Sequence, residues 1–246
     1  MKTLTIDIET RPLVSHTWSM WNVNIGLPQL IDPGGVICFA AKWKDDRKVH
    51  FYSDFHHDHE TMIGKAYELL DEADAVVHFN GTKFDLPWLN REFVMAGYTP
   101  HSPVKEIDLL RVVRRQFKFA SNRLDHVAQQ LGIGAKTKHT GHQLWIDCIA
   151  GDPAAWKLMK KYNIQDTVLE EKLYLRLLPW ITNHPNVPLL DGETEVACPN
   201  CSGKNFQRRG YQVALTGRYP RIHCQDCGAW SRLTKRESSV PVAGVK

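Results

Sequence analysis

Two acidic residues, Asp7 and Glu9, stand two positions apart in the opening segment MKTLTIDIETRP. Side chains of an extended strand alternate between its two faces, so both carboxylates point away from Leu4, Ile6 and Ile8. Their α-carbons lie about 6–7 Å apart, because each residue of a strand rises about 3.3 Å. Two anions directed at one point repel each other unless a cation lies between them. The pair therefore predicts a bound cation, and a solvent-facing edge strand is the alternative.

A third acidic residue, Asp166, lies in a long segment of helical periodicity, residues 153–178. One stripe of this helix contains six residues at steps of three or four: Ala155, Met159, Tyr162, Asp166, Leu169 and Leu173. An unpaired carboxylate on a face that packs against a sheet is costly. Asp166 therefore needs a metal ion, an arginine partner or a hydrogen-bond network. Tyr162 lies one turn earlier and reaches the same place.

A fourth carboxylate, Asp85, follows the predicted strand 75–80 in the segment NGTKFDLPWL. α/β proteins place ligands beyond strand ends, although an Asp before Leu-Pro also suits the start of a helix as its cap. Four hard oxygen ligands suit Mg²⁺ or Mn²⁺ better than zinc. Two such ions about 4 Å apart stabilise the attacking and the leaving oxygen of a phosphodiester displacement. The residue types thus favour phosphodiester chemistry, with a tyrosine that holds the water.

These side chains need strand ends that meet and a helix that packs across the strands. Strands are expected at residues 4–9, 36–43, 48–53, 75–80 and 104–107, and helices at 59–73, 86–97, 123–131 and 153–178. Consecutive strands near the start, then strands separated by helices, predict an α/β fold with a mixed sheet. Four regions are expected: a body at 1–180, a Pro-rich linker at 181–195, a cysteine module at 196–235 and a disordered tail at 236–246.

Three motifs, in this order, resemble those of a known family: DIET at residues 7–10, NGTKFDLPWL at 80–89 and YNIQD at 162–166. They are similar to the motifs of the DEDD (DnaQ-like) 3′–5′ exonucleases, and the Tyr-x-x-x-Asp spacing matches the tyrosine-containing (DEDDy) subgroup. The resemblance covers residues 1–178. It extends to the proofreading domains of family-B polymerases and to stand-alone, often phage-encoded, exonucleases. It implies an RNase H-like fold, with a five-stranded mixed sheet and flanking helices.

The resemblance also implies roles for the acidic residues and the tyrosine. Asp7 would bridge two Mg²⁺ or Mn²⁺ ions, and Asp85 would serve the second of them. Glu9 and Asp166 would bind the ion that activates water. Tyr162 would orient the attacking water, so all five would be catalytic residues and the four carboxylates would be metal ligands.

The same resemblance places Asn80 and Phe84, within the second motif, beside the terminal nucleotide. The implied activity is hydrolysis of phosphodiester bonds from a 3′ end, which releases nucleoside 5′-monophosphates, with single-stranded DNA favoured over RNA as the substrate. A polymerase or another replication protein is an expected partner, because proofreading would need a polymerase in trans. The alternatives are a non-catalytic module that recruits nucleic acid or protein, and a structure-specific endonuclease that uses the same ions.

Four cysteines form two C-x-x-C pairs in the last fifth of the chain: Cys198, Cys201, Cys224 and Cys227. Four thiolates in this pattern are typical of a closed, tetrahedral, structural zinc site. A segment of about 40 residues buries too little surface to fold without such a metal. The sequence therefore predicts a zinc ribbon that holds one Zn²⁺.

The ribbon segment is basic and contains aromatic residues between its arginines. From Val196 onward there are nine Lys and Arg against two acidic residues, whereas the preceding residues are slightly acidic as a whole. Aromatic rings and arginines together stack on bases and contact phosphates, so Arg208, Arg209 and Tyr211 are predicted substrate-binding residues. A miniature core, solubility and protein docking are the alternative reasons for these residue types.

Three other segments leave alternatives open. HHDHE at 56–60 contains metal-ligand types, but a loop that enters a helix explains it as well. Trp18 and Trp21 suit either stacking on a strand terminus or core packing. The loop-like segment 134–145 is basic enough to contact phosphates, and solvated lysines explain it equally.

The bulk composition argues against two classes of protein. No apolar run approaches the about 20 residues of a membrane helix, and the N-terminus lacks the layout of a signal peptide. The solitary Cys38 and Cys148 suit packing rather than a disulfide framework. A cytoplasmic protein without a membrane partner is expected, in the host cytoplasm if it is phage-encoded.

Overall fold

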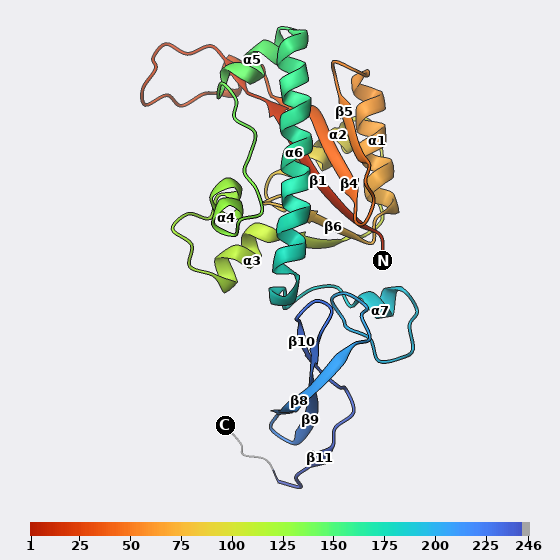
Figure 1. Cartoon of the computed structure of the whole chain (residues 1–246). Helices are drawn as coiled ribbons and strands as arrows, with labels where there is room; N and C mark the ends of the chain where they lie inside the picture. Colours follow the sequence, from red (N-terminus) through yellow and green to blue (C-terminus); the bar gives the residue numbers. More distant parts are fainter. Residues whose placement is uncertain (243–246) are drawn as a thin grey trace. The chain divides into compact units, whose positions relative to one another are not determined.

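The computed structural model describes residues 1–242 and divides into two compact units. One unit consists of residues 2–174, and the other of Met1 together with the described residues from Leu175 to 242. Figure 1 shows the elements of each unit in the colours of the sequence. Within the described residues, no helix has the length and apolar run needed to cross a bilayer.

A five-stranded mixed sheet organises the larger unit, with the strand order β5-β4-β1-β6-β7. Its strands are β1 (Thr3–Arg11), β4 (Gly35–Trp43), β5 (Val49–Ser53), β6 (Ala75–His78) and β7 (Lys105–Asp108). β4 runs antiparallel to both β1 and β5, whereas β6 runs parallel to both β1 and β7. The predicted α/β fold with a five-stranded mixed sheet is confirmed.

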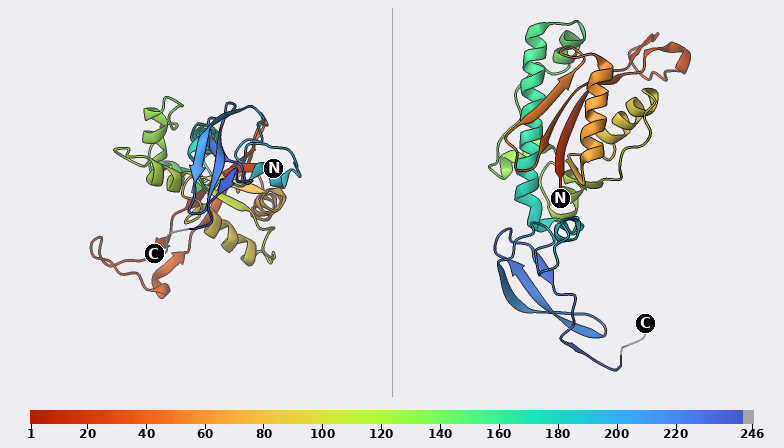
Figure 2. Two further views of the ribbon diagram at one scale, coloured as in Figure 1. Left: turned by 90° about the horizontal axis from the view of Figure 1, so that it is seen from below. Right: turned by 90° about the vertical axis from the view of Figure 1, so that its right-hand side faces the viewer.

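Helices cover both faces of this sheet (Figures 1 and 2). α1 (His59–Glu72) and α2 (Asp85–Met95) pack against the face that carries Leu4, Ile6 and Ile8. α5 (Gln143–Ile149) and α6 (Pro153–Leu177) pack against the other face, near Ile37 and Cys38. Two short helices, α3 (Leu109–Gln116) and α4 (Leu124–Gln130), follow β7. Because side chains alternate along β1, its acidic residues lie on the side that α6 covers.

α6 matches the predicted long helix closely. It begins at Pro153, where Asp152 accepts a hydrogen bond of 2.9 Å from the Ala154 amide. All six residues of the predicted stripe are buried, including Asp166. A short 3₁₀ turn, η2 (Leu178–Trp180), follows its last residue. α5 was not anticipated, because its first residues fall in a segment that we expected to be a loop.

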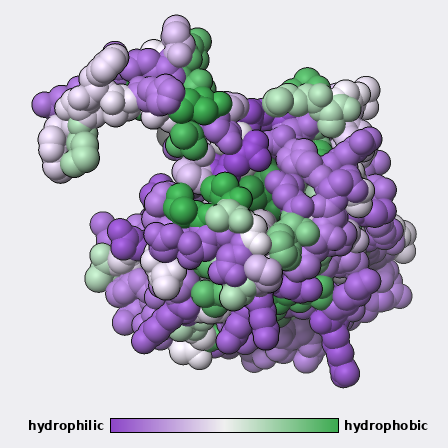
Figure 3. All heavy atoms as spheres, turned by 90° about the horizontal axis from the view of Figure 1, so that it is seen from above, coloured by the Kyte–Doolittle hydropathy of each residue, from purple (hydrophilic) through white to green (hydrophobic). Residues whose placement is uncertain are grey.

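An arm of residues 12–34 leaves the body directly after β1 and returns into β4 (Figure 1). It contains β2 (Val14–Ser15), the 3₁₀ turn η1 (Leu27–Gln29) and β3 (Leu30–Asp32). Trp18 is fully exposed and Trp21 is 78% exposed, so core packing is the wrong explanation for both. Figure 3 shows this arm projecting from the body, with apolar side chains at its base.

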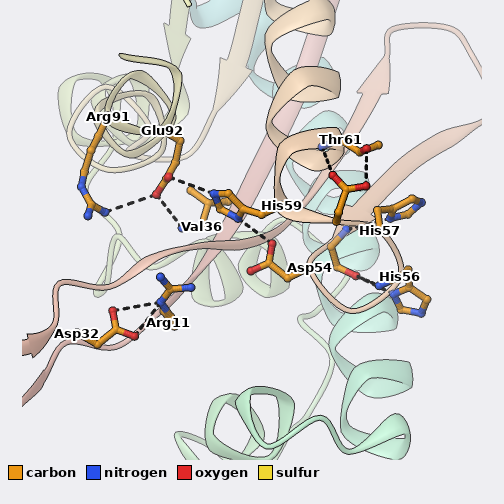
Figure 4. A network of polar contacts seen from close by, with 12 residues as sticks. Arg11, Asp32, Val36, Asp54, His56, His57, His59, Thr61, Arg91 and Glu92 are labelled. Carbon is orange, nitrogen blue, oxygen red and sulfur yellow. Dashed lines mark hydrogen bonds and ion pairs between the residues drawn. The ribbon is translucent and has the colours of Figure 1, made fainter. Parts of the chain in front are cut away.

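The HHDHE segment forms a helix start rather than a metal site (Figure 4). The Asp58 carboxylate accepts hydrogen bonds of 2.7 Å from both the amide and the hydroxyl of Thr61, and so caps α1. His59 lies between Asp54, at 2.9 Å, and Glu92, at 3.3 Å. Within residues 1–242, metal-binding atoms converge at two places, and neither is in this segment.

The smaller unit contains a four-stranded sheet built around a hairpin. Its strands are β8 (Phe206–Val213), β9 (Gly217–Cys224), β10 (Trp230–Arg232) and β11 (Ser238–Ser239), and β9 pairs with the other three. The segment expected to be a linker contains α7 (Val187–Leu190), whose Val187 and Pro188 are buried. β11 lies in the expected disordered tail, since Ser238 pairs with Arg218, and residues 243–246 lie outside the described residues.

We expect Gly81→Ala to lower the free energy of unfolding by about 1–3 kcal/mol, the usual cost of overpacking. The Gly81 amide donates a 3.0 Å hydrogen bond to Nδ1 of the buried His78, and a Cβ on Gly81 would lie 2.4 Å from His78 Cγ. Urea titration followed by circular dichroism measures the change. Gly26→Ala is the control, because the nearest atom to its Cβ is 3.6 Å away. Equal stability of the two variants would contradict the prediction.

Candidate active site

Three carboxylates from two elements converge on the α6 side of the sheet. Asp7 and Glu9 project from β1, and Asp166 projects from the middle of α6. One oxygen of each lies within 4.8 Å of the others. We call these three residues the acidic cluster. Such a spacing of oxygen atoms fits coordination of a shared divalent cation.

Asn163 fixes the position of Asp7. Its side-chain amide donates to the Asp7 carboxylate at 2.7 Å and to the Asp7 carbonyl oxygen at 3.1 Å. Asn163 is fully buried and lies one turn before Asp166, inside the YNIQD motif. The sequence offered that proximity as a signal, but Asn163 was not predicted as a site residue.

Asp85 lies against β1 rather than capping its own helix. β6 pairs with β1 only from Thr3 to Thr5, so β1 continues beyond its parallel neighbour. The Ile8 amide on this uncovered edge donates a 3.1 Å hydrogen bond to Asp85 Oδ1. Asp85 is the first residue of α2, and Phe84, at the N-cap, has no side-chain cap hydrogen bond. The buried Asp85 therefore borders the acidic cluster without belonging to it.

Lys136 reaches the acidic cluster from the loop between α4 and α5. Its Nζ lies 2.6 Å from Asp166 Oδ2 and 3.4 Å from the Tyr162 hydroxyl. Asp166 thus forms an ion pair, which was one of the expected alternatives, but its partner is a lysine rather than an arginine. Asp166 Oδ1 remains buried without a hydrogen-bond partner. One orphaned buried oxygen beside two other carboxylates fits a site for an additional cation.

Burial and crowding raise the pKa values of these acidic residues. Burial raises the pKa of Glu9 to about 8, and Asp166 and Asp85 add to the effect while Lys136 opposes it. Burial also raises the pKa of Asp85 to about 7. The pKa of Asp7 lies well above its usual range, because burial and the charges of Glu9 and Asp85 disfavour its ionised form. A bound cation would reverse this trend, because positive charge favours carboxylates.

The pKa values of two neighbouring groups are raised for the same reasons. Burial, followed by the charge of Glu9, raises the pKa of Tyr162, so its hydroxyl keeps its proton. Glu170 lies one turn after Asp166, is fully buried and has one carboxyl oxygen without a partner. Burial, followed by the charge of Asp7, raises its pKa well above the usual range. Glu170 was not predicted from the sequence, where it reads as one more acidic residue of α6.

An open cleft with a volume of about 650 Å³ shares Lys136 with the acidic cluster. Its lining also includes Asn80 and two arginines, Arg114 and Arg123, that were not predicted. Asn80 has a left-handed backbone (φ 74°), and its amide donates a 3.0 Å hydrogen bond to Asp108. These three cations outnumber the one carboxylate of the lining, Asp125, so the cleft suits an anionic ligand.

Phe84 and Asp108 flank this region in different ways. The Phe84 ring is 41% exposed although it directly precedes the buried Asp85. Asp108 caps α3 by accepting a 3.0 Å hydrogen bond from the Leu110 amide, and it holds Asn80 at the same time. Asp108 is therefore a structural residue, and Phe84 offers an aromatic surface.

The four cysteines of the smaller unit form the second cluster of metal-binding atoms. Their sulfur atoms all lie within 4.8 Å of one another, with 3.6 Å between Cys198 and Cys227 and 3.7 Å between Cys201 and Cys224. A tetrahedron with metal–sulfur bonds of about 2.3 Å has edges of about 3.8 Å. The cluster therefore fits the geometry of a zinc ribbon. Arg208, Arg209 and Tyr211 lie on β8 of this unit and do not belong to the unit of the acidic cluster.

Comparisons with known proteins agree with this fold. A family model described as the RNase_H superfamily matches residues 4–178. The structure of the family B DNA polymerase from the hyperthermophilic archaeon Pyrobaculum calidifontis matches 72% of this chain, with a TM-score of 0.55 and 19% sequence identity. The matched part is 24% of the polymerase chain, so this chain spans about a quarter of that protein. A search of curated proteins gives no match.

We expect the thermal stability of the Mg²⁺-free protein to fall by at least about 4 °C between pH 5.5 and 8.5. Unfolded Asp and Glu titrate near pH 4, whereas Asp85 and Glu9 in the fold titrate near 7 and 8. The folded state therefore binds more protons in this range, and stability falls as pH rises. Added Mg²⁺ or Mn²⁺ should flatten the curve. Scanning fluorimetry checks this, and a Glu9→Gln/Asp85→Asn variant with an equally steep curve would contradict it.

We expect one equivalent of zinc in the purified chain and its loss in Cys224→Ser, because a structural zinc site needs all four thiolates. Elemental analysis measures the metal, and limited proteolysis should show residues 175–246 cut while residues 2–174 persist. Cys148→Ala, which removes a buried thiol outside the cluster, is the control and should keep its zinc. A fully metal-loaded Cys224→Ser would rule the site out.

Proposed function

The chain belongs to the RNase H superfamily, and from this premise we propose that it is a metal-dependent 3′–5′ exonuclease of the tyrosine-containing DEDD type. The proposed substrate is single-stranded DNA, and the products are nucleoside 5′-monophosphates. The observation that carries the proposal is the convergence of Asp7, Glu9 and Asp166, with a buried oxygen of Asp166 left without a partner. A fold alone would not require this costly arrangement.

The acidic residues would hold two Mg²⁺ or Mn²⁺ ions. We assign Asp7 to both ions, Glu9 and Asp166 to the first, and Asp85 to the second. When bound, such ions stabilise negative charge on the attacking and leaving oxygens of a phosphodiester. Asn163 keeps Asp7 aimed at this position through its 2.7 Å hydrogen bond.

Tyr162 is proposed to orient the attacking water. Its raised pKa keeps the hydroxyl protonated, so it acts by hydrogen bonding rather than as a base. Its oxygen lies 3.4 Å from Lys136 Nζ, at the border between the acidic cluster and the cleft. This position lets one hydroxyl hold water beside the carboxylates while the lysine faces a phosphate.

The cleft beside the cluster suits the 3′ end of a strand. We assign Asn80 and the exposed ring of Phe84 to the terminal nucleotide. Arg114 and Arg123 would contact phosphates, because each carries a fixed positive charge into the cleft. Zinc is assigned to the four cysteines as a structural ion, and a polymerase that acts in trans stays a predicted partner.

The decisive experiment uses 5′-labelled single-stranded DNA and RNA with Mg²⁺ or Mn²⁺. The intact chain should shorten the DNA stepwise from its 3′ end. Asp7→Ala and Asp85→Ala should each lower the rate by on the order of a thousandfold, the equivalent of about 4 kcal/mol of transition-state stabilisation. Binding, measured by fluorescence anisotropy, should be retained. Glu68→Ala, which removes an exposed carboxylate from α1, is the control and should cut normally.

A circular single-stranded DNA separates the alternatives. An exonuclease cannot start on a circle, so the intact chain should leave it uncut. Cleavage of the circle would instead identify an endonuclease. Binding without any cleavage of linear DNA or RNA would identify a recruitment module and overturn the proposal.

A further inference from the structure

The two faces of the β8–β9 hairpin carry different chemistry. Along β9, Tyr219, Arg221 and His223 alternate with residues of the opposite face. Trp230 and Arg232 of β10 stand opposite His223 and Arg221, so they share that face. We call it the Trp230 face, and it comprises Arg209, Tyr219, Arg221, His223, Trp230 and Arg232.

Arg209 belongs to the Trp230 face because it alternates with Arg208 along β8, and a bulge follows it. The pairing with β9 shifts between Arg208 and Tyr211, and Gly210 takes a left-handed backbone (φ 71°) there. The Arg221 side chain donates a 3.0 Å hydrogen bond to the Arg209 carbonyl oxygen across this bulge. As a result, the Arg209 guanidinium lies 6.0 Å from the centre of the Trp230 ring.

The rings of this face are held in a stack. Trp230 and His223 are stacked, with ring centres 4.6 Å apart and planes inclined by 25°, and His223 forms a 3.1 Å hydrogen bond with the Gly228 carbonyl oxygen. Arg221 lies over Trp230 at 5.0 Å, and Arg232 lies over Tyr219 at 3.9 Å. Trp230 nevertheless remains 51% exposed. The face thus presents a half-exposed ring with two arginines over it.

These aromatic residues do not build the core of the ribbon. The buried cluster of this unit consists of cysteines, Ala229 and the partly buried Phe206. Trp230 packs outside that cluster, so core packing does not account for it. Packing in a miniature core, the alternative reason for aromatic residues in this segment, therefore explains Phe206 but not Trp230.

One carboxylate offsets part of the positive charge on the opposite face. Glu237 pairs with Arg208 at 3.0 Å and with Arg218 at 3.9 Å. Arg208 also donates a 3.1 Å hydrogen bond to the Tyr211 hydroxyl. By contrast, none of the three arginines of the Trp230 face forms an ion pair with a carboxylate of residues 1–242. Free positive charge is therefore concentrated on one face.

We propose that the Trp230 face binds single-stranded nucleic acid, with a base stacked on Trp230 and phosphates held by the arginines. Free base faces are available in single strands but not inside a duplex, where neighbouring bases already cover them. The arginines supply the electrostatic part of the binding. The proposal keeps Arg209 from the set predicted from sequence and replaces Arg208 and Tyr211 by Arg221 and Trp230. One part of this proposal rests on the proposed function, namely that the bound strand is the substrate of the active site.

Fluorescence anisotropy on a labelled single-stranded oligonucleotide tests the proposal. The full-length, zinc-loaded chain is used without added Mg²⁺ or Mn²⁺, so that no cleavage occurs. Trp230→Ala should weaken binding about tenfold, a typical loss for one stacked base. Arg209→Ala/Arg221→Ala should reduce the slope of log affinity against log salt by about 1.4, or about 0.7 for each lost phosphate contact.

A charge-matched control separates the Trp230 face from general basicity. Lys204→Ala/Arg218→Ala also removes two positive charges, but both residues have carboxylate partners. This variant should bind almost as tightly as the unaltered chain, and zinc content and circular dichroism should confirm that all variants are folded. An equal loss in both double variants would overturn the proposal. So would a duplex that binds as tightly as the single strand and ignores Trp230→Ala, or an absence of nucleic-acid binding, which would point to a protein ligand.

The binding test can reject the ribbon proposal without rejecting the exonuclease, and the cleavage test can reject the exonuclease without rejecting the ribbon proposal. Trp230-dependent binding by a chain that never cuts would support the ribbon proposal and reject the exonuclease. Cleavage that is unaffected by Trp230→Ala at every DNA concentration, together with unchanged affinity, would reject the ribbon proposal alone.

Discussion

The burial of several carboxyl groups side by side, followed by the repulsion between them, is the constraint on which the larger unit depends. The acidic cluster places three of them within reach of one ion, and each has a raised pKa. Lys136 supplies one positive charge and Asn163 one pair of amide hydrogens, which offset part of the cost. Asp166 still has a buried oxygen without a partner. A divalent cation would therefore stabilise this region as well as supply its chemistry.

The backbone of β1 decides where this cluster forms. β1 extends beyond the end of its pairing with β6, and the Ile8 amide in this extension donates a hydrogen bond that holds Asp85 at the sheet edge. The register between β1 and β4 shifts between Glu9 and Thr10. Such bulges often lie beside active sites, because they redirect the strand. Thr10 and Arg11 still pair with β4, and after Arg11 the chain leaves the sheet as the arm that carries Trp18. One strand thus provides two carboxylates, an anchor for a third and the start of an exposed arm.

The ribbon differs from the larger unit in what forms its core. Four cysteines at its centre leave little need for large apolar side chains in the core. Aromatic residues such as Trp230 are consequently free to lie on the surface, where cations surround them. Glu237 offsets part of the positive charge on one face, so the hairpin is more positive on the Trp230 face. In a unit this small, the cysteine cluster and one glutamate define which surface is available to a ligand.

Local patterns in the sequence determined the mixed sheet, the stripe of α6 that buries Asp166, and the shared direction of Asp7 and Glu9. Each follows from a period of two or 3.6 residues, which neighbouring residues specify by themselves. The sequence did not show that Lys136 neutralises Asp166, because 30 residues and a loop without periodicity separate them. Nor did it show that Tyr211 lies on the face of Arg208 rather than on that of Arg209, because the bulge at Gly210 depends on pairing with β9. Long-range packing decided both, since it alone sets the path of a loop and the register of a strand.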